Sequence, residues 1–496
     1  MTTTRRALSG LLAAALAISV MALTGPGAAA GAAGPRLMLR RTSSEVSVRR
    51  PEGRPFSFNP GVYLASMDAA FSLEIGREDY DSPFHVDQVM PGGGTRSLPD
   101  SLFESPSYQG LPRFTRMTVT DLAGDVRADR LMPLCPNSYD RQRIADGGPV
   151  TPTFPDDCWS NPFSLGLAWG IDRDWATGVT GYGTRLKLPA GRYHVDFSVA
   201  PLYADLFDVT PQDGYTSVTL IVRDRRDSGS HARSAPRTPG DVGSPNPKVP
   251  IDDTPDPSTV PDLIPLPSFG IGVRHRNSGD WLSFGANVWV DGPSPLVVEG
   301  FRREDEPLMD AYQYFYDGDQ QVARARVGSF EYDARHGHTH WHFKQFATYE
   351  LLEADKTTAV ISEKEAFCLA PTDAIDMLAE NAEWRPWLQG LSTACGGPEA
   401  LWVREVLPVG WGDTYYQGLP GQSFDVTDLP NGTYFIKVQA NPGGHLFESN
   451  MANNVRLRKV ILGGRPGHRT VRVPPWHGID TEGGFFRQLL ANAHPA

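Results

Sequence analysis

The chain has 496 residues, of which 40% are hydrophobic and 21% charged, so it is long enough to form two or more domains with their own cores. Its formal net charge of -12 argues against a nucleic-acid backbone as partner and is compatible with a basic partner. The 50 glycines and 43 prolines are typical of a chain built from short strands and turns.

The N-terminus has the pattern of an export signal. Arg5 and Arg6 precede the apolar run ALSGLLAAALAISVMAL, and the small-residue stretch TGPGAAAGAAG follows it. A membrane anchor is the alternative, but the uninterrupted apolar part is short for a bilayer span, and no later segment is long and apolar enough. We predict a signal peptide over residues 1–34 and a secreted protein without a stable membrane span once the signal is removed. The route, Sec or twin-arginine, stays open.

The four cysteines fit an oxidising compartment. They are Cys135, Cys158, Cys368 and Cys395, and no CxxC pattern is present, which disfavours a thiolate metal site. An even, sparse set in an exported protein usually pairs. Proximity in the sequence predicts the disulfides Cys135–Cys158 and Cys368–Cys395.

Composition divides the remaining chain into four segments. Residues 35–224 contain strand-like runs such as GRYHVDFSV and TSVTLIVRD and predict a β-rich domain of unknown role. Residues 225–261 are rich in Pro, Ser and Asp and predict an extended linker. Residues 262–462 predict a second folded domain, and 463–496 a tail that packs loosely or not at all.

The second domain is expected to be mainly β. WLSFGANVWV, SPLVVEG and the stretch after the Asn431-Gly432 turn predict strands, and residues 372–384 predict one helix with Thr372 as its N-cap. The string Leu-Pro-x-Gly-x-Tyr begins at both Leu188 and Leu429. We expect a mainly β fold: a sandwich-like domain with a few short helices, preceded by another β-rich domain.

The stretch HGHTHWHF places histidines at every second position: His336, His338, His340 and His342. In a strand these side chains share one face. Converging imidazoles favour copper, zinc, nickel or iron over calcium or magnesium, and copper(II) stands highest in affinity. The spacing is not that of a helical HExxH zinc peptidase. A histidine-rich surface loop without a metal is the alternative.

Several ordered motifs resemble the lysyl oxidase family over residues 262–462. The family carries His-x-His-x-His, an aromatic-rich strand, a Lys before Phe-Cys-Leu, and later Asp-Thr-Tyr and a Glu-Ser-x-x-x-Asn-Asn-Val segment. The matching residues here are His338, His340, His342, Phe346, Tyr349, Leu351, Leu352, Lys364, Phe367, Cys368, Leu369, Asp413, Thr414, Tyr415, Glu448, Ser449, Asn453, Asn454 and Val455. The resemblance does not extend to the N-terminal domain.

The resemblance implies a copper amine oxidase. Copper would be bound by His338, His340 and His342, and Lys364 and Tyr415 would join to form lysine tyrosylquinone, although a one-residue slip would select Tyr416 instead. The reaction implied is oxidative deamination of a primary amine, with peptidyl lysine as one candidate, by molecular oxygen to an aldehyde with release of ammonia and hydrogen peroxide. Asp413 or Asp425 could act as the base.

The resemblance also implies a second, calcium site. Its oxygen ligands would come from Asp262, the Leu263 carbonyl, Glu448, Asn453 and Asn454, with Asn450 where some relatives have Asp. Solvated carboxylates at a capped turn are the alternative.

The connection from Lys364 to Tyr415 is longer than in the animal enzymes. The rival function is a secreted copper-binding or adhesion protein with this fold and no quinone chemistry.

Overall fold

The computed structural model describes residues 34–483 except 51–52, 104–109, 159–160, 181–183, 225–244, 247, 304–307, 334–338, 345, 363 and 365. Nearly all of the predicted signal peptide therefore lies outside the described residues. Strands dominate, which confirms the mainly β prediction. Among the described residues, no helix is long and apolar enough to span a membrane.

We use the name N-terminal domain for the part that contains β1–β15. Its sheets have the strand orders β1-β4-β12-β10, β11-β5-β6-β7, β2-β15-β14-β8-β9 and β13-β3. The elements are β1 (Leu37–Arg41), β2 (Glu45–Arg50), β3 (Phe56–Phe58), β4 (Val62–Ser66), β5 (Phe71–Gly76), β6 (His85–Val89), β7 (Thr95–Leu98), η1 (Asp100–Leu102), β8 (Leu111–Asp121), β9 (Val126–Leu134), β10 (Arg141–Arg143), β11 (Gly166–Ile171), β12 (Trp175–Gly178), β13 (Thr184–Leu186), β14 (Gly191–Val199), α1 (Pro201–Leu206) and β15 (Tyr215–Asp224).

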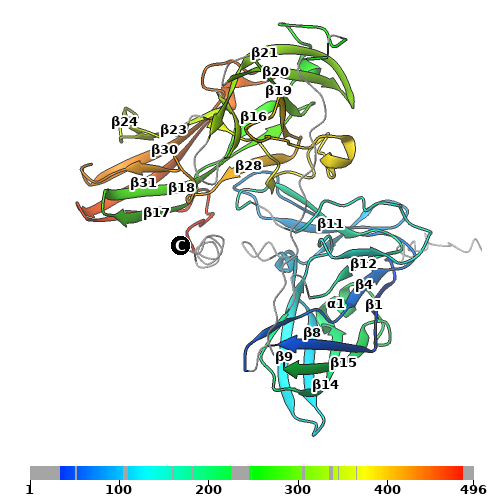
Figure 1. Ribbon diagram of the computed structural model, residues 1–496. Helices are drawn as coiled ribbons and strands as arrows, with labels where there is room; N and C mark the ends of the chain where they lie inside the picture. Colours follow the sequence, from blue (N-terminus) through cyan, green and yellow to red (C-terminus); the bar gives the residue numbers. More distant parts are fainter. Residues whose placement is uncertain are drawn as a thin grey trace, which may run out of the picture.

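The C-terminal domain contains β16–β32 and lies above the N-terminal domain in the view of Figure 1. Its sheets follow β16-β18-β28-β26, β25-β22-β21-β20-β19-β27 and β24-β23-β30-β31-β32, with β17 and β29 also paired to β18. The elements are η2 (Pro257–Thr259), β16 (Asp262–Pro265), β17 (Phe269–Arg276), β18 (Gly279–Asp291), β19 (Leu296–Arg302), β20 (Leu308–Asp317), β21 (Gln320–Asp333), β22 (His340–Lys344), β23 (Ala347–Leu352), β24 (Thr358–Ile361), β25 (Ala366–Phe367), β26 (Asp373–Ala374), η3 (Pro386–Gln389), β27 (Trp402–Leu407), β28 (Trp411–Tyr415), β29 (Ser423–Asp425), β30 (Gly432–Ala440), η4 (Met451–Asn453), β31 (Val455–Arg465) and β32 (His468–Arg472).

The strands predicted from the sequence are confirmed as β14, β15, β18, β19 and β30. The repeated Leu-Pro-x-Gly-x-Tyr string has the same role in both domains. The Tyr193 hydroxyl donates to the Pro189 carbonyl at 3.0 Å, and the Tyr434 hydroxyl donates to the Pro430 carbonyl at 2.8 Å. Each tyrosine therefore fastens the turn that precedes its strand.

The helix predicted over residues 372–384 is wrong. The segment forms the two-residue strand β26, which pairs with β28, and continues in turns. Ile375 packs with Phe163 and Trp289, whereas Met377 joins the core of the N-terminal domain. The apolar side chains of this segment are thus buried in different clusters, and tertiary packing overrides the local preference for a helix.

Two segments expected to be loose are packed where the structure describes them. In the second half of the predicted linker, the Arg324 backbone donates to Pro250 at 2.9 Å and accepts from Asp252 at 3.0 Å, and Val249 and Val260 are buried. In the predicted tail, β32 pairs with β31, and the Glu482 carboxylate accepts from the Ile271 backbone at 2.7 Å. A few apolar or charged anchors fix both segments.

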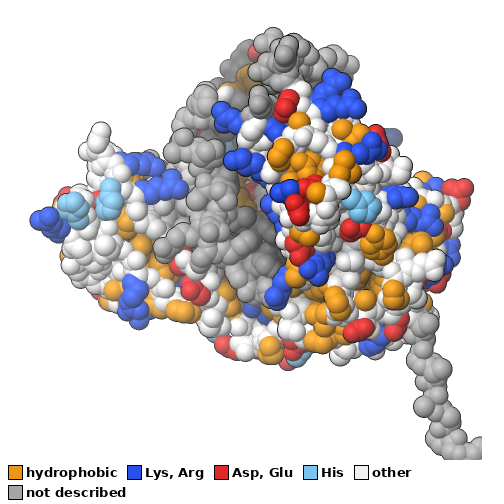
Figure 2. Space-filling model, turned by 90° about the horizontal axis from the view of Figure 1, so that it is seen from below, with side chains coloured by type: hydrophobic (Ala, Val, Ile, Leu, Met, Phe, Trp, Pro, Cys, Tyr) orange, Lys and Arg blue, Asp and Glu red, His pale blue; other side chains and the backbone are white. Residues whose placement is uncertain are grey.

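Both predicted disulfides, Cys135–Cys158 and Cys368–Cys395, are confirmed. Figure 2 shows Lys, Arg and His side chains gathered at one end of the underside, where β17 and β31 end in Figure 1. Exposed residues at the ends of β17, β31 and β32 include Arg274, Arg276, Arg465, His468 and Arg472. The net negative charge of the chain is therefore unevenly distributed.

Candidate active site

Lys364 and Tyr415 lie side by side in the core of the C-terminal domain. Lys364 is 3% exposed, and its Nζ lies 4.4 Å from the centre of the Tyr415 ring and 5.1 Å from that of Phe367. Gly421 closes over the lysine: a Cβ at this glycine, whose φ is 79°, would lie 2.8 Å from the Lys364 Cβ. The long connection between the two residues therefore folds back and brings the predicted quinone precursors together.

The phenol of Tyr415 is held by the backbone of Cys368. Its hydroxyl accepts from the Cys368 amide at 2.7 Å and donates to the Cys368 carbonyl at 3.0 Å. The Phe367 ring meets the Tyr415 ring edge-on at 5.0 Å. Burial raises the pKa of Tyr415 well above its ordinary value, and the carboxylates of Asp413 and Glu405 raise it further. The side chain is therefore a neutral, oriented phenol.

Tyr416 has a different environment. It follows the last residue of β28, and burial together with the charges of Asp373 and Asp413 raises its pKa. The ring beside the Lys364 amine is that of Tyr415, the residue favoured by the sequence register.

Two of the predicted copper ligands are described, and both lie on β22. The Nε2 atoms of His340 and His342 are 3.0 Å apart. The Nδ1 of His342 lies 3.7 Å from an Asp333 carboxylate oxygen on the neighbouring strand β21. Burial, and secondarily the charge of Lys364, lowers the pKa of His340, which favours the neutral imidazole. His338, like His336, lies outside the described residues.

The histidine pair could bind one transition-metal ion. The Nε2 atoms of His340 and His342 lie 3.0 Å apart, close enough to reach the same ion, and imidazole ligands suit copper. Asp333 on the far nitrogen of His342 is the kind of partner that orients a ligand histidine.

Asp413 is the acidic group nearest to the phenol in the sequence and lies in the same strand. It is buried, and one of its carboxylate oxygens has no hydrogen-bond partner among the described residues. Burial raises its pKa well above the ordinary value, the negative charge of Asp373 adds to this, and Lys364 opposes it. Asp425, the other candidate base, is exposed, and its carboxylate is occupied by the backbone and hydroxyl of Thr427. The geometry favours Asp413.

Glu405 is a buried carboxyl group that the sequence did not single out. It accepts from the Leu369 amide at 3.0 Å, and burial raises its pKa well above the ordinary value. Its other oxygen lies 3.8 Å from the Cys395 sulfur, which is in a disulfide and therefore offers no thiolate to a metal. The sequence analysis also missed Asp373, Asn287 and Asn161. Like Glu405, these residues carry no local motif, because they come from separate segments and meet their partners only in the fold.

The predicted calcium ligands also converge, at the junction of β16 with η4. The Asn453 amide donates to Asp262 at 2.9 Å, and the Asn454 amide donates to Glu448 at 2.6 Å. The Leu263 amide lies 3.3 Å from Glu448. Within the described residues, the side-chain carbonyl oxygens of Asn453 and Asn454 are buried and accept no hydrogen bond. The cluster thus offers oxygen donors of the kind that calcium prefers, although in this structure the amide nitrogens of both asparagines face the carboxylates.

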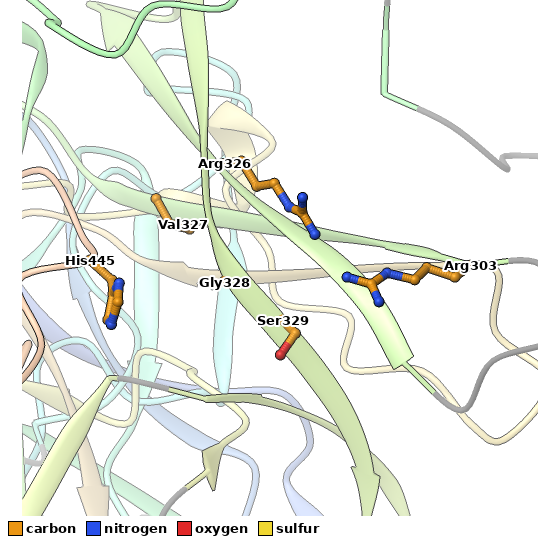
Figure 3. A pocket seen from close by; sticks show the side chains of 6 residues that line it. All are labelled: Arg303, Arg326, Val327, Gly328, Ser329 and His445. Atoms are coloured by element: carbon orange, nitrogen blue, oxygen red, sulfur yellow. The ribbon is translucent and has the colours of Figure 1, made fainter.

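A hollow of about 390 Å³ lies beside β21, and Figure 3 shows Arg303 and Arg326 pointing toward one another across part of it. Both guanidinium groups contact Asp310, at 2.7 and 2.5 Å. Ser329, which also lines the hollow, is two residues before Glu331, the register partner of His342. The hollow is therefore close along the strand to the register partner of His342, and the single carboxylate of Asp310 offsets only one of the two arginine charges.

Comparison with known proteins gives related sequences for the C-terminal region. The sequence model of the lysyl oxidase family matches residues 313–468. Lysyl oxidase homolog 2 of Gallus gallus is 27% identical over 161 residues, which are 32% of this chain and 18% of that protein. The Homo sapiens homolog 2 is 27% identical over 158 residues, with the same coverage. Protein-lysine 6-oxidase of Sus scrofa is 30% identical over 128 residues, which are 26% of this chain and 45% of that protein.

The chain thus spans less than half the length of each of these relatives, and the similarity lies in the region that contains Lys364, Tyr415 and the histidine strand. Residues 313–468 of this chain therefore match the lysyl oxidase family.

Proposed function

We propose that the chain is a secreted, copper-dependent amine oxidase. It would convert a primary amine, molecular oxygen and water into an aldehyde, ammonia and hydrogen peroxide. One observation carries this proposal: a buried lysine amine lies 4.4 Å from the ring centre of a buried tyrosine. The motifs around both residues resemble those around the quinone precursors of the family. Burying an ammonium group costs free energy, so the burial of Lys364 against a phenol indicates a functional role for the pair.

We propose His338, His340 and His342 as the copper ligands, with Asp333 orienting the ring of His342. When present, copper and the lysine tyrosylquinone made from Lys364 and Tyr415 supply the electron sink and the reaction with oxygen. The protein's own contribution is placement. Cys368 fixes the phenol through its backbone, and Gly421 holds the lysine stem in contact with the ring.

Asp413 is the proposed base. The carboxylate oxygen without a partner among the described residues is available to take the proton from the carbon next to the substrate nitrogen. Its raised pKa makes the ionised form a stronger base than an ordinary aspartate. Phe367 and the surrounding core exclude water from this part of the site.

The proposed substrate is a primary amine, and peptidyl lysine is favoured because relatives include a protein-lysine 6-oxidase. A cationic substrate also suits a chain with a net charge of -12. Calcium, held by Asp262, the Leu263 carbonyl, Glu448, Asn453 and Asn454, would join β16 to the segment around η4 and stabilise the domain.

Peptide mass mapping of the mature protein, purified with copper under air, tests the proposal. We expect the peptides containing Lys364 and Tyr415 to be joined, with a mass that indicates an oxidised tyrosine. If both peptides are separate and unmodified in folded, copper-loaded protein, the quinone mechanism fails. The rival, a secreted copper-binding or adhesion protein, would then hold.

A further inference from the structure

A loop of the N-terminal domain is buried against the strand pair that carries the proposed base. Residues 161–166 run into β11, which Figure 1 shows at the upper edge of the N-terminal domain, toward the C-terminal domain. The Leu165 amide donates to the Ile375 carbonyl at 2.7 Å, and the Met377 amide donates to the Gly166 carbonyl at 2.8 Å. The Ser164 hydroxyl donates to the Ala374 carbonyl at 2.7 Å. The loop therefore extends the β26 segment of the other domain.

Asn161 reaches furthest into the C-terminal domain. It is 1% exposed, and its side-chain amide donates to an Asp373 carboxylate oxygen at 2.9 Å. Its side-chain carbonyl accepts from the Phe163 amide at 3.0 Å, which fixes which end of the amide faces Asp373. Phe163 is itself wedged against Trp476, with ring centres 5.4 Å apart. The asparagine is thus held in one orientation from both sides.

Asp373 passes this contact on to β28. The oxygen bound by Asn161 also accepts from the Thr414 hydroxyl and lies 3.4 Å from the Asn287 amide. Thr414 is the residue between Asp413 and Tyr415, and its own amide donates to the Thr372 hydroxyl at 2.7 Å. Asp373 pairs in register with Gly412, the residue before Asp413. The carboxylate therefore lies between the N-terminal loop and the strand that holds the proposed base and the phenol.

We propose that Asn161 of the N-terminal domain is a positioning residue of the oxidase site, acting through Asp373 on Asp413 and Tyr415. This rests on the proposed function. The N-terminal domain is then part of the enzyme, and its loss would disturb the site and not only remove a separate module. The Asp373 carboxylate lies near the buried Asp413 carboxyl group. The hydrogen bond from Asn161 therefore influences the electrostatic effect of Asp373 on Asp413.

The pH dependence gives the proposal a readout that a purely structural contact would not move. Loss of a donor disfavours the ionised form of Asp373. With less negative charge beside it, the pKa of Asp413 falls toward its ordinary value, because Asp373 now contributes to raising it. The acid limb of the kcat/KM profile should then move to lower pH. The other titratable groups coupled to Asp413 are Lys364, Glu405, Tyr349, Tyr415 and Tyr416.

The test compares Asn161→Leu with Ser164→Ala in the full chain. Each variant loses one buried hydrogen bond across the junction and one within the loop, because Ser164 also accepts from the Asn161 amide and Asn161 accepts from the Phe163 amide. Of the two residues, only Asn161 contacts Asp373. We expect Asn161→Leu to lower kcat/KM for a primary amine by roughly 10- to 100-fold, the range for a displaced catalytic group, and to shift the acid limb to lower pH. Ser164→Ala should leave the profile unchanged. Asn161→Ala replaces the leucine variant if the latter does not fold.

Hydrogen exchange of the peptide that covers β28, measured by mass spectrometry, needs no activity. We expect faster exchange in Asn161→Leu than in Ser164→Ala. Equal exchange and an unshifted pH profile in both variants would overturn the inference. If wild-type protein forms no Lys364–Tyr415 linkage and releases no peroxide, the proposed function fails instead, and the β28 exchange alone then decides whether Asn161 orders this strand.

Discussion

The amine of Lys364 lies 4.4 Å from the ring centre of Tyr415, although 50 residues of chain, including β25, β26 and β27, separate them. Cys368 contributes to this arrangement from the side of the lysine, because its backbone holds the Tyr415 hydroxyl. The disulfide to Cys395 then connects this point to the middle of the long connection. Contacts at both ends of the connection thus fix Lys364 next to Tyr415. The sequence alone could not show that this connection folds back.

Replacing Tyr415 by Phe should abolish both the linkage to Lys364 and amine-dependent peroxide release, since the phenol oxygen is needed to make the quinone. Tyr416→Phe is the matched control and should keep both, because the ring beside Lys364 belongs to Tyr415. Copper content reports on folding, and intact mass reports on the linkage. If the linkage is retained in Tyr415→Phe and lost in Tyr416→Phe, the quinone precursor is Tyr416.

The strands were predictable where one face is buried and the other is not. β14 and β30 alternate between buried and more exposed residues along most of their length, and period-two patterns report this alternation directly. The segment after Thr372 was not predictable in this way. Ile375 and Met377 are two residues apart, so they would lie on opposite faces of a helix, and they pack into different clusters because the N-terminal loop and β28 bind this segment from two sides.

The site divides in the same manner. Lys364, Tyr415 and the histidines were found through ordered motifs, and both disulfides through spacing in the sequence. Glu405, Asp373, Asn287 and Asn161 carry no local motif, because a buried polar residue is recognised by its partners and those partners are distant in sequence. The proposed role of the N-terminal domain was not predictable for this reason, because it depends on the contact of Asn161 with Asp373.

Asp333→Asn should weaken copper binding by about 10- to 100-fold, the usual effect of losing a carboxylate that orients a ligand histidine. The carboxylate of Asp333 lies 3.7 Å from the Nδ1 of His342. Glu331→Gln is the control, since it removes the same charge from the same strand but its partner is Lys344, at 3.1 Å. Competition with a chromophoric copper chelator measures the affinity. Equal losses in the two variants would indicate a general charge effect and exclude a specific role for Asp333.

The two disulfides should differ in their effect on activity and agree in their effect on stability. Cys135–Cys158 and Cys368–Cys395 close loops with sequence separations of 23 and 27, so removing either should cost about 3.5 kcal/mol in the free energy of unfolding of its domain. Only the second is attached to the Tyr415 hydroxyl through Cys368. Double serine variants, assayed under conditions where both are folded, should show reduced amine oxidation only for Cys368→Ser/Cys395→Ser. Equal activity in both would mean that the Tyr415 contact does not depend on the disulfide.

Calcium removal should change how stability depends on pH. Burial raises the pKa of Asp262 and of Glu448, and Asp291 adds to the shift of Asp262. For a carboxyl group whose folded pKa exceeds its unfolded value, the folded state disfavours ionisation. In a chelator the melting temperature should therefore rise as the pH falls from neutral through these raised pKa values, and level off below the ordinary carboxyl range.

Calcium favours the ionised forms, so with calcium in excess this rise should disappear or reverse. Stability at neutral pH should increase by about 2.7 kcal/mol when free calcium is a hundred times Kd. Glu448→Gln should lose most of the calcium response, because the charge is gone while the side-chain oxygen still accepts from the Asn441 and Asn454 amides. Identical melting curves with and without calcium in the wild-type protein, at every pH, would show that the cluster of Asp262, Glu448, Asn453 and Asn454 is a hydrogen-bonded junction and binds no cation.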